Sequence, residues 1–339
     1  MKRHTRGFTL IEIMVALGIG LVLLAAFVTV LARVRDQFAT DESVARLADA
    51  SRHALSVLVP DLEHAGFYGI APARSVQYIR RGVVVAAGDA LAQSRADDFA
   101  PVADVPKGTH DCGANFALDL AMTVEGSNNG YRTSPDFASD CAPTAVAGGA
   151  RAGADTLTVR HAALETAPPH PGRMQLYVRR LDAFAPLTLF ADGHAPGAVD
   201  ANHEVRDLEV RTYYIANSSV DRPGWPALRV KALTESGGSA QFRDEEILPG
   251  VEDLQIELGL ATEENGVPRV RYAPPDAVER AARVVAVRFW LRIRADSTEG
   301  GHRDARSLQY ADLRFTPTPA EAAHRRMLVE RTVALRNAP

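Results

Sequence analysis

A long apolar segment near the N-terminus constrains this chain more than any other feature. The 25 residues from Phe8 to Ala32 contain one charged side chain, Glu12. An α-helix needs about 20 residues to cross the hydrocarbon core of a bilayer, so this segment is long enough to span it. Lys2, Arg3 and Arg6 precede the segment, with no acidic residue among them. Such a positive flank predicts a cytoplasmic N-terminus, with the rest of the chain across the membrane.

A cleaved secretory signal is the nearest alternative interpretation. The apolar region of such a signal is about 7–15 residues long and ends at a cleavage site formed by small residues. The segment here is longer, and Ala25-Ala26 is the only weak candidate for that site. The length therefore favours a helix that stays in the membrane.

Glu12 is the unusual residue of the segment. A carboxylate in a membrane helix costs about 2.5–3.5 kcal/mol on insertion scales, and such residues usually have a function. Cleavage between Gly7 and Phe8 would create an α-amino group four residues before Glu12. An amine and a carboxylate from neighbouring helices can neutralise each other in lipid, where either one alone is costly. A glutamate tolerated near the interface of an ordinary signal-anchor is the alternative.

The residues around Glu12 resemble the class III leader of type IV pilins and of type II secretion pseudopilins. The resemblance rests on the basic leader, Gly7, Phe8, the run Thr9-Leu10-Ile11, and Glu12. In those families a prepilin peptidase cleaves after the glycine and methylates the new N-terminal phenylalanine. The resemblance therefore implies that residues 1–7 are a cleaved leader, that Phe8 is the methylated N-terminus, and that Glu12 is needed for assembly.

The helix is expected to continue beyond the apolar segment, with residues 8–32 as its membrane half and 33–66 as a soluble amphipathic half. Apolar residues recur there at steps of three and four, which is typical of one buried helix face. They are Val44, Leu47, Ala48, Leu55, Leu58, Leu62 and Ala65. Pro60 is expected to kink or restart the helix because its ring removes a backbone donor. Gly66 is a typical C-terminal stop.

Residues 67–339 are expected to form a β-rich globular domain. Residues 67–153 read as irregular, with a short strand signal at Gly82–Val85 and a turn at Gly126–Gly130. Residues 154–339 alternate apolar and polar positions without long helical patterns, which predicts an antiparallel sheet. The expected strands are Leu157–Arg160, Leu176–Val178, Val205–Ile215, Ala227–Leu233, Leu254–Leu258, Val284–Ile293 and Leu328–Leu335.

One of these expected strands carries a basic face. Val285, Val287, Phe289, Leu291 and Ile293 alternate with a set that includes three arginines, at positions 288, 292 and 294. The ordinary interpretation is a half-buried strand whose arginines point into solvent.

Both cysteines, Cys112 and Cys141, follow the membrane segment. In an oxidising compartment they would form a disulfide, worth roughly 3–4 kcal/mol by the chain-entropy model. Two free thiols or half of a metal site is the alternative. His110 beside Cys112 does not complete a metal site, because two further ligands at suitable spacing are lacking.

The remaining sequence argues against nucleic-acid binding and catalysis. The net charge is −4, and it becomes −7 without the three basic residues of the leader, whereas a nucleic-acid surface would be basic. The chain has no His-Glu-x-x-His pair, Gly-x-Ser-x-Gly elbow, phosphate-binding loop or calcium loop. The ten histidines are scattered, and those at 161, 170 and 194 are expected in or near surface loops. We therefore expect no enzyme, cofactor or metal site.

Further segments resemble PilW-type minor pilins of the type IV pilus, in that family's order. They are Asp61–Phe67, Asp155–Arg160, Gly250–Gln255 and Val333–Asn337; Pro60 departs from the family pattern. The resemblance implies an α+β, type IV pilin-like fold, with the long helix packed on a large antiparallel β-rich domain. GspJ-type pseudopilins of type II secretion share the leader and remain the alternative.

The resemblance also implies partners and a location. The chain would be held in the inner membrane by one helix, with the globular domain in the periplasm, and would move into the pilus on assembly. Its partners would be the prepilin peptidase, the major pilin, other minor pilins and a PilY-type tip adhesin. Its role would be to prime or cap the filament.

Overall fold

The computed structural model describes residues 9–69, 76–80, 83–86, 120, 122–131, 143–179, 187–279, 282–298 and 302–338. The elements are α1 (Leu10–His64), β1 (Val76–Arg80), β2 (Val83–Ala86), β3 (Val124–Ser127), β4 (Thr156–Ala162), β5 (Pro171–Arg179), β6 (Leu187–Asp192), β7 (His203–Ala216), β8 (Ala227–Ser236), β9 (Ser239–Pro249), β10 (Val251–Glu264), β11 (Val267–Ala273), β12 (Val284–Thr298), β13 (Leu308–Tyr310), β14 (Leu313–Phe315) and β15 (His324–Ala334). Three short 3-10 turns lie at Ala145–Ala147, Pro275–Ala277 and Glu321–Ala323.

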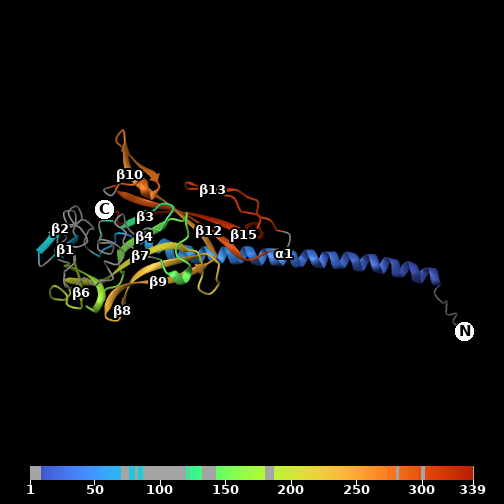
Figure 1. Cartoon of the computed structure of the whole chain (residues 1–339), viewed down its shortest axis with the longest axis horizontal. Helices are drawn as coiled ribbons and strands as arrows, with labels where there is room; N and C mark the ends of the chain where they lie inside the picture. The colour runs from blue at the N-terminus through green and yellow to red at the C-terminus, as the bar shows by residue number, and fades with distance from the viewer. Residues whose placement is uncertain are drawn as a thin grey trace, which may run out of the picture.

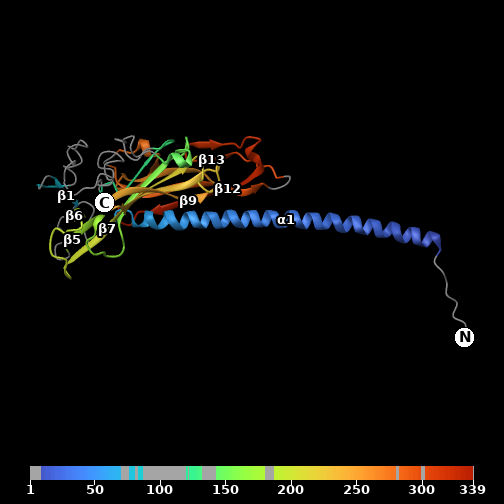
Figure 2. The ribbon, with the colours of Figure 1, turned by 60° about the horizontal axis from the view of Figure 1, so that its bottom comes forward.

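The helix α1 is a single element of 55 residues, about 80 Å long. Its N-terminal half projects alone beyond the β-rich domain, and its C-terminal half lies along that domain (Figure 1). Figure 2, turned about the horizontal axis, shows most of the strands on one side of the C-terminal half of the helix. A long N-terminal helix packed on a β-rich domain is the fold class that the sequence predicts.

Pro60 does not interrupt α1, so the expected restart is wrong, whereas a kink at Pro60 stays a prediction. The helix continues to His64, and the Pro60 ring lies on the exposed face. Its missing N–H therefore leaves the Ser56 carbonyl without its usual intrahelical donor on the outer side of the helix. The helix ends just before Gly66, which has φ +77° and donates its N–H to the Arg160 carbonyl at 2.9 Å. A Cβ at Gly66 would lie 2.7 Å from the Asn337 carbonyl oxygen, so this position requires glycine.

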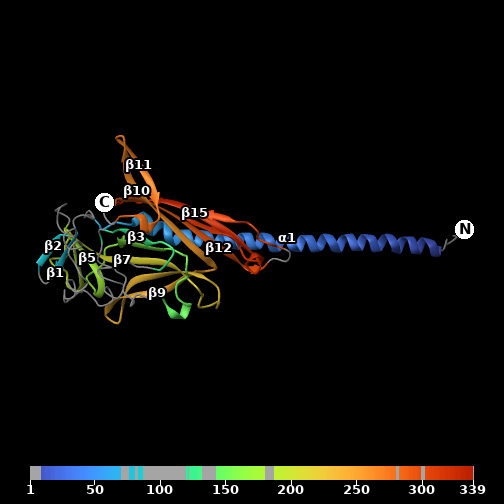
Figure 3. The same ribbon diagram turned by 45° about the horizontal axis from the view of Figure 1, so that its top comes forward.

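Two main sheets pack with α1. One has nine strands, in the order β2-β1-β6-β5-β7-β4-β3, with β8 attached to β7 and β9 to β8. The other has four strands, in the order β11-β10-β12-β15, and β13 and β14 form a separate hairpin. The pairings among the described strands are antiparallel except for β1 with β6. In Figure 3 the β10–β11 end of the smaller sheet stands away from the rest of the domain.

One apolar core joins the helix to both sheets. Its helix residues include Leu47, Leu58 and Leu62, and Leu157 and Phe289 come from the two sheets. At 25–30 cal/mol per Å² of apolar surface, such burial is the main force that holds the helix on the domain.

The buried face of α1 differs slightly from the predicted one. Val44 is exposed, and Ser43 and Ala54 are buried instead. The buried positions are those that face the sheets, and the small side chains of Ser43 and Ala54 fit there.

The region 67–153 contains the strands β1, β2 and β3, of which only β2 coincides with a strand signal in the sequence, that at Gly82–Val85. Gly126 belongs to β3, so the predicted turn begins only after Ser127. A Cβ at Gly126 would lie 2.3 Å from Ile256 Cδ1 and 2.7 Å from the Thr156 carbonyl oxygen. Glycine is needed at this position because β3 lies close to β10. In a sequence, a glycine of this kind is easily mistaken for a turn signal.

The basic face of β12 is largely buried, which overturns the expectation of solvated arginines. Arg292 packs its guanidinium 3.6 Å from the ring centre of Phe315, on the β13–β14 hairpin. Its Nε lies 3.1 Å from Glu252 Oε2. Arg326, whose side chain is fully buried, donates to both oxygens of the same carboxylate at 2.7 and 3.0 Å. The hairpin thus covers the outer face of the smaller sheet, where Glu252 and Asp253 together pair with Arg292 and Arg326.

Asp155, just before β4, links three parts of the domain. Its side chain accepts N–H bonds from Asn129 at 2.7 Å and Ile256 at 2.8 Å. Burial nevertheless raises the pKa of Asp155 to about 7, with Asp312 and Asp253 adding to the effect. The folded state therefore binds this proton more tightly than the unfolded chain, in which an aspartate has a pKa of about 3.9.

We expect the free energy of unfolding to fall as pH rises from about 4 to about 7, by at most about 1.4 kcal/mol per pH unit from this group. The check is chemical denaturation of the full chain in detergent over that range, compared with Asp155→Asn. The stability of the wild type relative to the variant should decrease with pH and level off above about 7. Asp41→Asn, at an exposed position of α1, is the control. A pH-independent difference between wild type and Asp155→Asn would contradict the assignment.

Candidate functional site: the start of the helix and the cluster around Asp61

The start of α1 is organised by Thr9 and Glu12. Thr9 is the N-cap, and its Oγ1 accepts the Glu12 N–H at 3.3 Å. Glu12 Oε2 in turn accepts the N–H and the hydroxyl of Thr9, both at 2.9 Å. This reciprocal pair is a capping box, which satisfies two backbone donors that a helix start otherwise leaves free. Oε1 of Glu12 takes part in neither bond, so the cap leaves one carboxylate oxygen facing outward.

The turns that follow Glu12 expose only apolar side chains along most of their length. Ile13, Leu17, Leu21 and Leu24 are each more than half exposed. The most apolar stretch of α1 is long and apolar enough to cross a membrane, and none of it is buried against the described part of the chain. A soluble monomer would not expose such a surface, so this half of α1 requires lipid or other helices around it.

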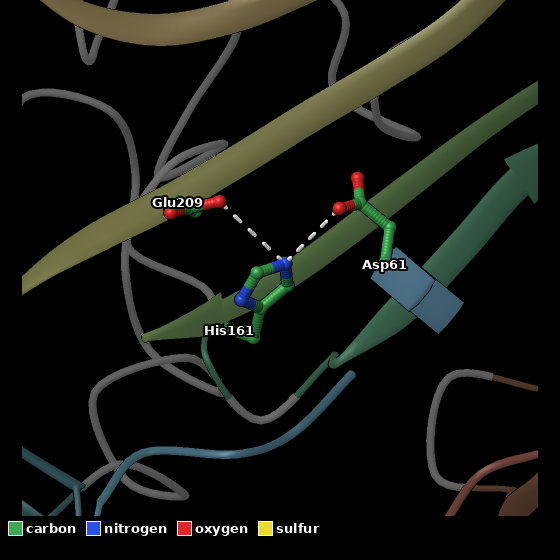
Figure 4. Close-up of side chains that lie close together, drawn as sticks. All are labelled: Asp61, His161 and Glu209. Atoms are coloured by element: carbon green, nitrogen blue, oxygen red, sulfur yellow. Dashed lines mark ion pairs between the residues drawn. The ribbon is translucent and has the colours of Figure 1, made fainter. Parts of the chain in front are cut away.

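A second cluster lies where α1 meets β4 and β7. It consists of Asp61, His161, Glu209, Arg211 and Tyr213, and Figure 4 shows the first three. Asp61 accepts hydrogen bonds from Arg211 and from the Tyr213 hydroxyl. Arg211 also pairs with Glu209 at 2.6 Å. His161 Nε2 lies 3.5 Å from Asp61 Oδ1 and 3.8 Å from Glu209 Oε2.

The electrostatics of this cluster favour ionised groups. Burial alone would raise the pKa of Asp61, but His161, Arg211 and Tyr213 outweigh burial and lower it. Burial would likewise lower the pKa of His161, whereas the neighbouring carboxylates raise it. Burial and the Asp61 charge raise the pKa of Tyr213, so it remains a neutral donor. The end of α1 is thus held to the larger sheet by a charged, hydrogen-bonded contact.

His161 is buried in β4, so its predicted surface-loop position is wrong. Sequence analysis singled out Asp61 only as part of a family-like segment and did not connect it with β7. The signal that could have revealed the contact is polar residues at inward positions of two strands, His161 and Arg211. Asp61 on α1, the partner of both residues, is 100 residues or more away in sequence. The spacing of residues alone does not reveal such a pairing.

Several predicted site residues fall outside the described part of the chain. Gly7 and Phe8 precede the first described residue. Cys112 and Cys141 lie in ranges that the structure does not describe. The cleavage site and the disulfide therefore remain predictions.

Comparison with known proteins gives two family matches. Residues 212–337 match the model of the Type IV Pilus-assembly protein W, and residues 2–28 match the Prokaryotic N-terminal methylation motif. Among solved structures, the Type IV-like pilin TTHA1219 from Thermus thermophilus is similar at a TM-score of 0.27 and 12% identity, over 58% of this chain and 82% of that one. No curated protein matches the chain.

The two matched regions lie at opposite ends of the sequence and correspond to different parts of the fold. The motif covers the start of α1, including Glu12, and the PilW region runs from β7 through β15. The methylation motif at the start of an apolar helix and the PilW-like region from β7 to β15 together support a type IV pilus-related pilin.

Proposed function

We propose that the protein is a minor pilin that takes part in assembly of the type IV pilus, where it primes or caps the filament. The exposed apolar half of α1, with the capped carboxylate of Glu12 at its start, is the observation that carries this proposal. In the membrane this half lies in lipid, and in the filament it packs against the corresponding helices of the major pilin and other minor pilins. The protein acts by assembly rather than by catalysis.

The proposed location follows from the same helix. The basic residues before Phe8 keep the N-terminus cytoplasmic, and the β-rich domain lies in the periplasm until the subunit enters the pilus. Prepilin peptidase removes residues 1–7 and methylates Phe8. At the tip, the large β-rich domain contacts the other minor pilins and a PilY-type adhesin.

Glu12 supplies the charge chemistry of assembly. The methylated amine of Phe8 and the Glu12 carboxylate lie near the same end of the helix, and a neighbouring subunit presents the same two groups. Oε1, which the capping box does not use, can receive the amine of a neighbour while Oε2 holds Thr9. Each charge then has a partner inside a medium where an unpaired ion is costly.

Deletion and complementation in the native host test the proposed role. Loss of the gene should reduce the number of pili in electron micrographs, and a plasmid copy should restore it. Normal piliation together with loss of a secreted protein would instead identify a GspJ-like pseudopilin of type II secretion. The match to a pilus-assembly family favours the first outcome.

Processing gives a separate expected result. Intact-mass measurement of the protein from membranes should show a chain that begins at Phe8 and carries one added methyl group. A chain that begins near Phe27, after Ala25-Ala26, would show signal-peptide cleavage instead and would contradict the pilin assignment. A host strain without its prepilin peptidase is the control and should retain residues 1–7.

A further inference from the structure

The cluster at the end of α1 places three potential ligand atoms around one point. They are Asp61 Oδ1, His161 Nε2 and Glu209 Oε2, and all lie within 4.8 Å of one another. The residues come from α1, β4 and β7, and their side chains converge in Figure 4. The His161 side chain is 6% exposed, so water does not surround its ring.

The protonation of His161 follows from its other ring nitrogen. Nδ1 lies 3.0 Å from the Ala162 carbonyl oxygen, which can only accept a hydrogen bond, so Nδ1 carries a proton. In the neutral ring Nε2 then presents a lone pair toward the carboxylates of Asp61 and Glu209. Nε2 has no hydrogen-bond partner among the described residues. A lone pair that faces two carboxylates is unfavourable, and either a proton on Nε2 or a bound cation removes the repulsion.

The distances distinguish a proton from a metal ion. An N–H···O bond between a charged ring and a carboxylate is about 2.7–2.9 Å long. Nε2 is 3.5 Å from Asp61 and 3.8 Å from Glu209, which is too far for either bond. Zinc binds nitrogen and oxygen at about 2.0–2.2 Å in a tetrahedron, so its ligand atoms lie about 3.3–3.6 Å apart. The two separations from Nε2, 3.5 and 3.8 Å, are close to that edge length, and the two carboxylate oxygens lie within 4.8 Å of each other.

Arg211 and Tyr213 support the ligands rather than replace the ion. Arg211 contacts the oxygens of Asp61 and Glu209 that face His161, and Tyr213 contacts the other Asp61 oxygen. A carboxylate oxygen has two lone pairs, so a guanidinium on one leaves the other for a metal. Hydrogen bonds of this kind orient ligating carboxylates in metal sites. With neutral His161, the two carboxylates and one guanidinium leave a net charge of −1, which attracts a cation.

We propose that Asp61, His161 and Glu209 bind a divalent transition-metal ion, with zinc the best match, and that this ion fastens the end of α1 to the larger sheet. An imidazole ligand excludes calcium and magnesium, which take oxygen ligands, whereas imidazole and carboxylate together suit zinc. Three protein ligands leave the fourth position for water.

The test uses the full processed chain in detergent micelles, treated with chelator and with its cysteines alkylated so that thiols do not bind metal. Titration with zinc chloride at neutral pH in a calorimeter should show one ion bound per chain. His161→Gln and Glu209→Gln should each weaken binding by about 100-fold or more, since even outer-shell changes cost about 10–100-fold. His53→Gln, on the exposed face of the same helix, is the matched control and should bind as the wild type does.

Thermal unfolding gives a second readout that does not depend on the calorimeter. Zinc should raise the Tm of the wild type and of His53→Gln but not of His161→Gln, because only a bound ion stabilises the folded state. Circular dichroism without zinc should show that the variants are folded, and Glu209→Gln, at a partly exposed position, serves if His161→Gln is not. Wild-type protein that binds no zinc would show that a proton occupies the site. Zinc binding that survives both substitutions would place the ion elsewhere. Either result overturns the proposal.

Discussion

Replacement of Glu12 by leucine is expected to leave a chain that is cleaved and inserted in the membrane but does not restore pili in a strain that lacks the native gene. The substitution leaves a neighbour's N-terminal amine without a countercharge in hydrocarbon, which costs roughly 3–5 kcal/mol for a broken buried pair. Since a factor of ten corresponds to about 1.4 kcal/mol, subunit association should fall several-hundred-fold. Pilus counts in electron micrographs measure the effect, and immunoblots of membranes confirm that the variant is present.

The capping box makes two further variants informative. Glu12→Gln retains the cap, because glutamine serves at this position of a capping box, but removes the charge. Thr9→Ala removes the cap but retains the charge, at a cost of about 0.5–2 kcal/mol to the start of the helix. If the charge acts in assembly, Glu12→Gln should fail as Glu12→Leu does, and Thr9→Ala should assemble. Normal pilus numbers with Glu12→Gln would show that Glu12 serves only to begin the helix.

The second large effect is expected at Glu252. Glu252→Gln should lower the stability of the β-rich domain by about 3–5 kcal/mol, because it removes the carboxylate that pairs with the fully buried Arg326, while Arg292 keeps its pair with Asp253. In a domain of this size each kcal/mol shifts Tm by about 2–4 °C, so Tm should fall by on the order of 10 °C. Differential scanning fluorimetry of the full chain in detergent measures the shift.

Glu264→Gln is the control for Glu252→Gln. It makes the same chemical change on the same strand, β10, at an exposed position whose partner Arg269 is also exposed. An exposed ion pair contributes about 0–1 kcal/mol, so Tm should change little. Similar Tm values for both variants would show that the buried arginines do not depend on Glu252.

The sequence predicted the parts of the fold that have local signals. The apolar run and the steps of three and four in residues 33–66 predicted a long helix, and alternation predicted strands that coincide with β4, β5, β7, β8, β10, β12 and β15. The type IV pilin-like class followed from the leader and was confirmed by the helix and the antiparallel sheets. Of the strands that were missed, β9 carries four charged residues in a row, and β11 is an exposed edge strand that contains Pro268.

What the sequence did not predict depends on contacts between distant segments. Arg292 was expected in solvent because nothing in its own strand shows that the β13–β14 hairpin covers it. His161 was expected in a loop because its partners, Asp61 and Glu209, lie on other elements. A buried charge and an exposed one look alike in a sequence. Only the arrangement of the elements distinguishes them.

The unbroken course of α1 has a consequence for how far the β-rich domain stands from the bilayer. The apolar run ends at Ala32, and the first helix residue buried against the domain is Ser43. The ten residues between them form about three helical turns, which make a stalk of exposed helix about 15 Å long. Arg46 marks the end of this stalk, where it pairs with Asp296 of β12 at 2.7 Å. In a chain anchored as we propose, this segment would hold the domain clear of the lipid headgroups and would leave residues 33–42 open to neighbouring subunits.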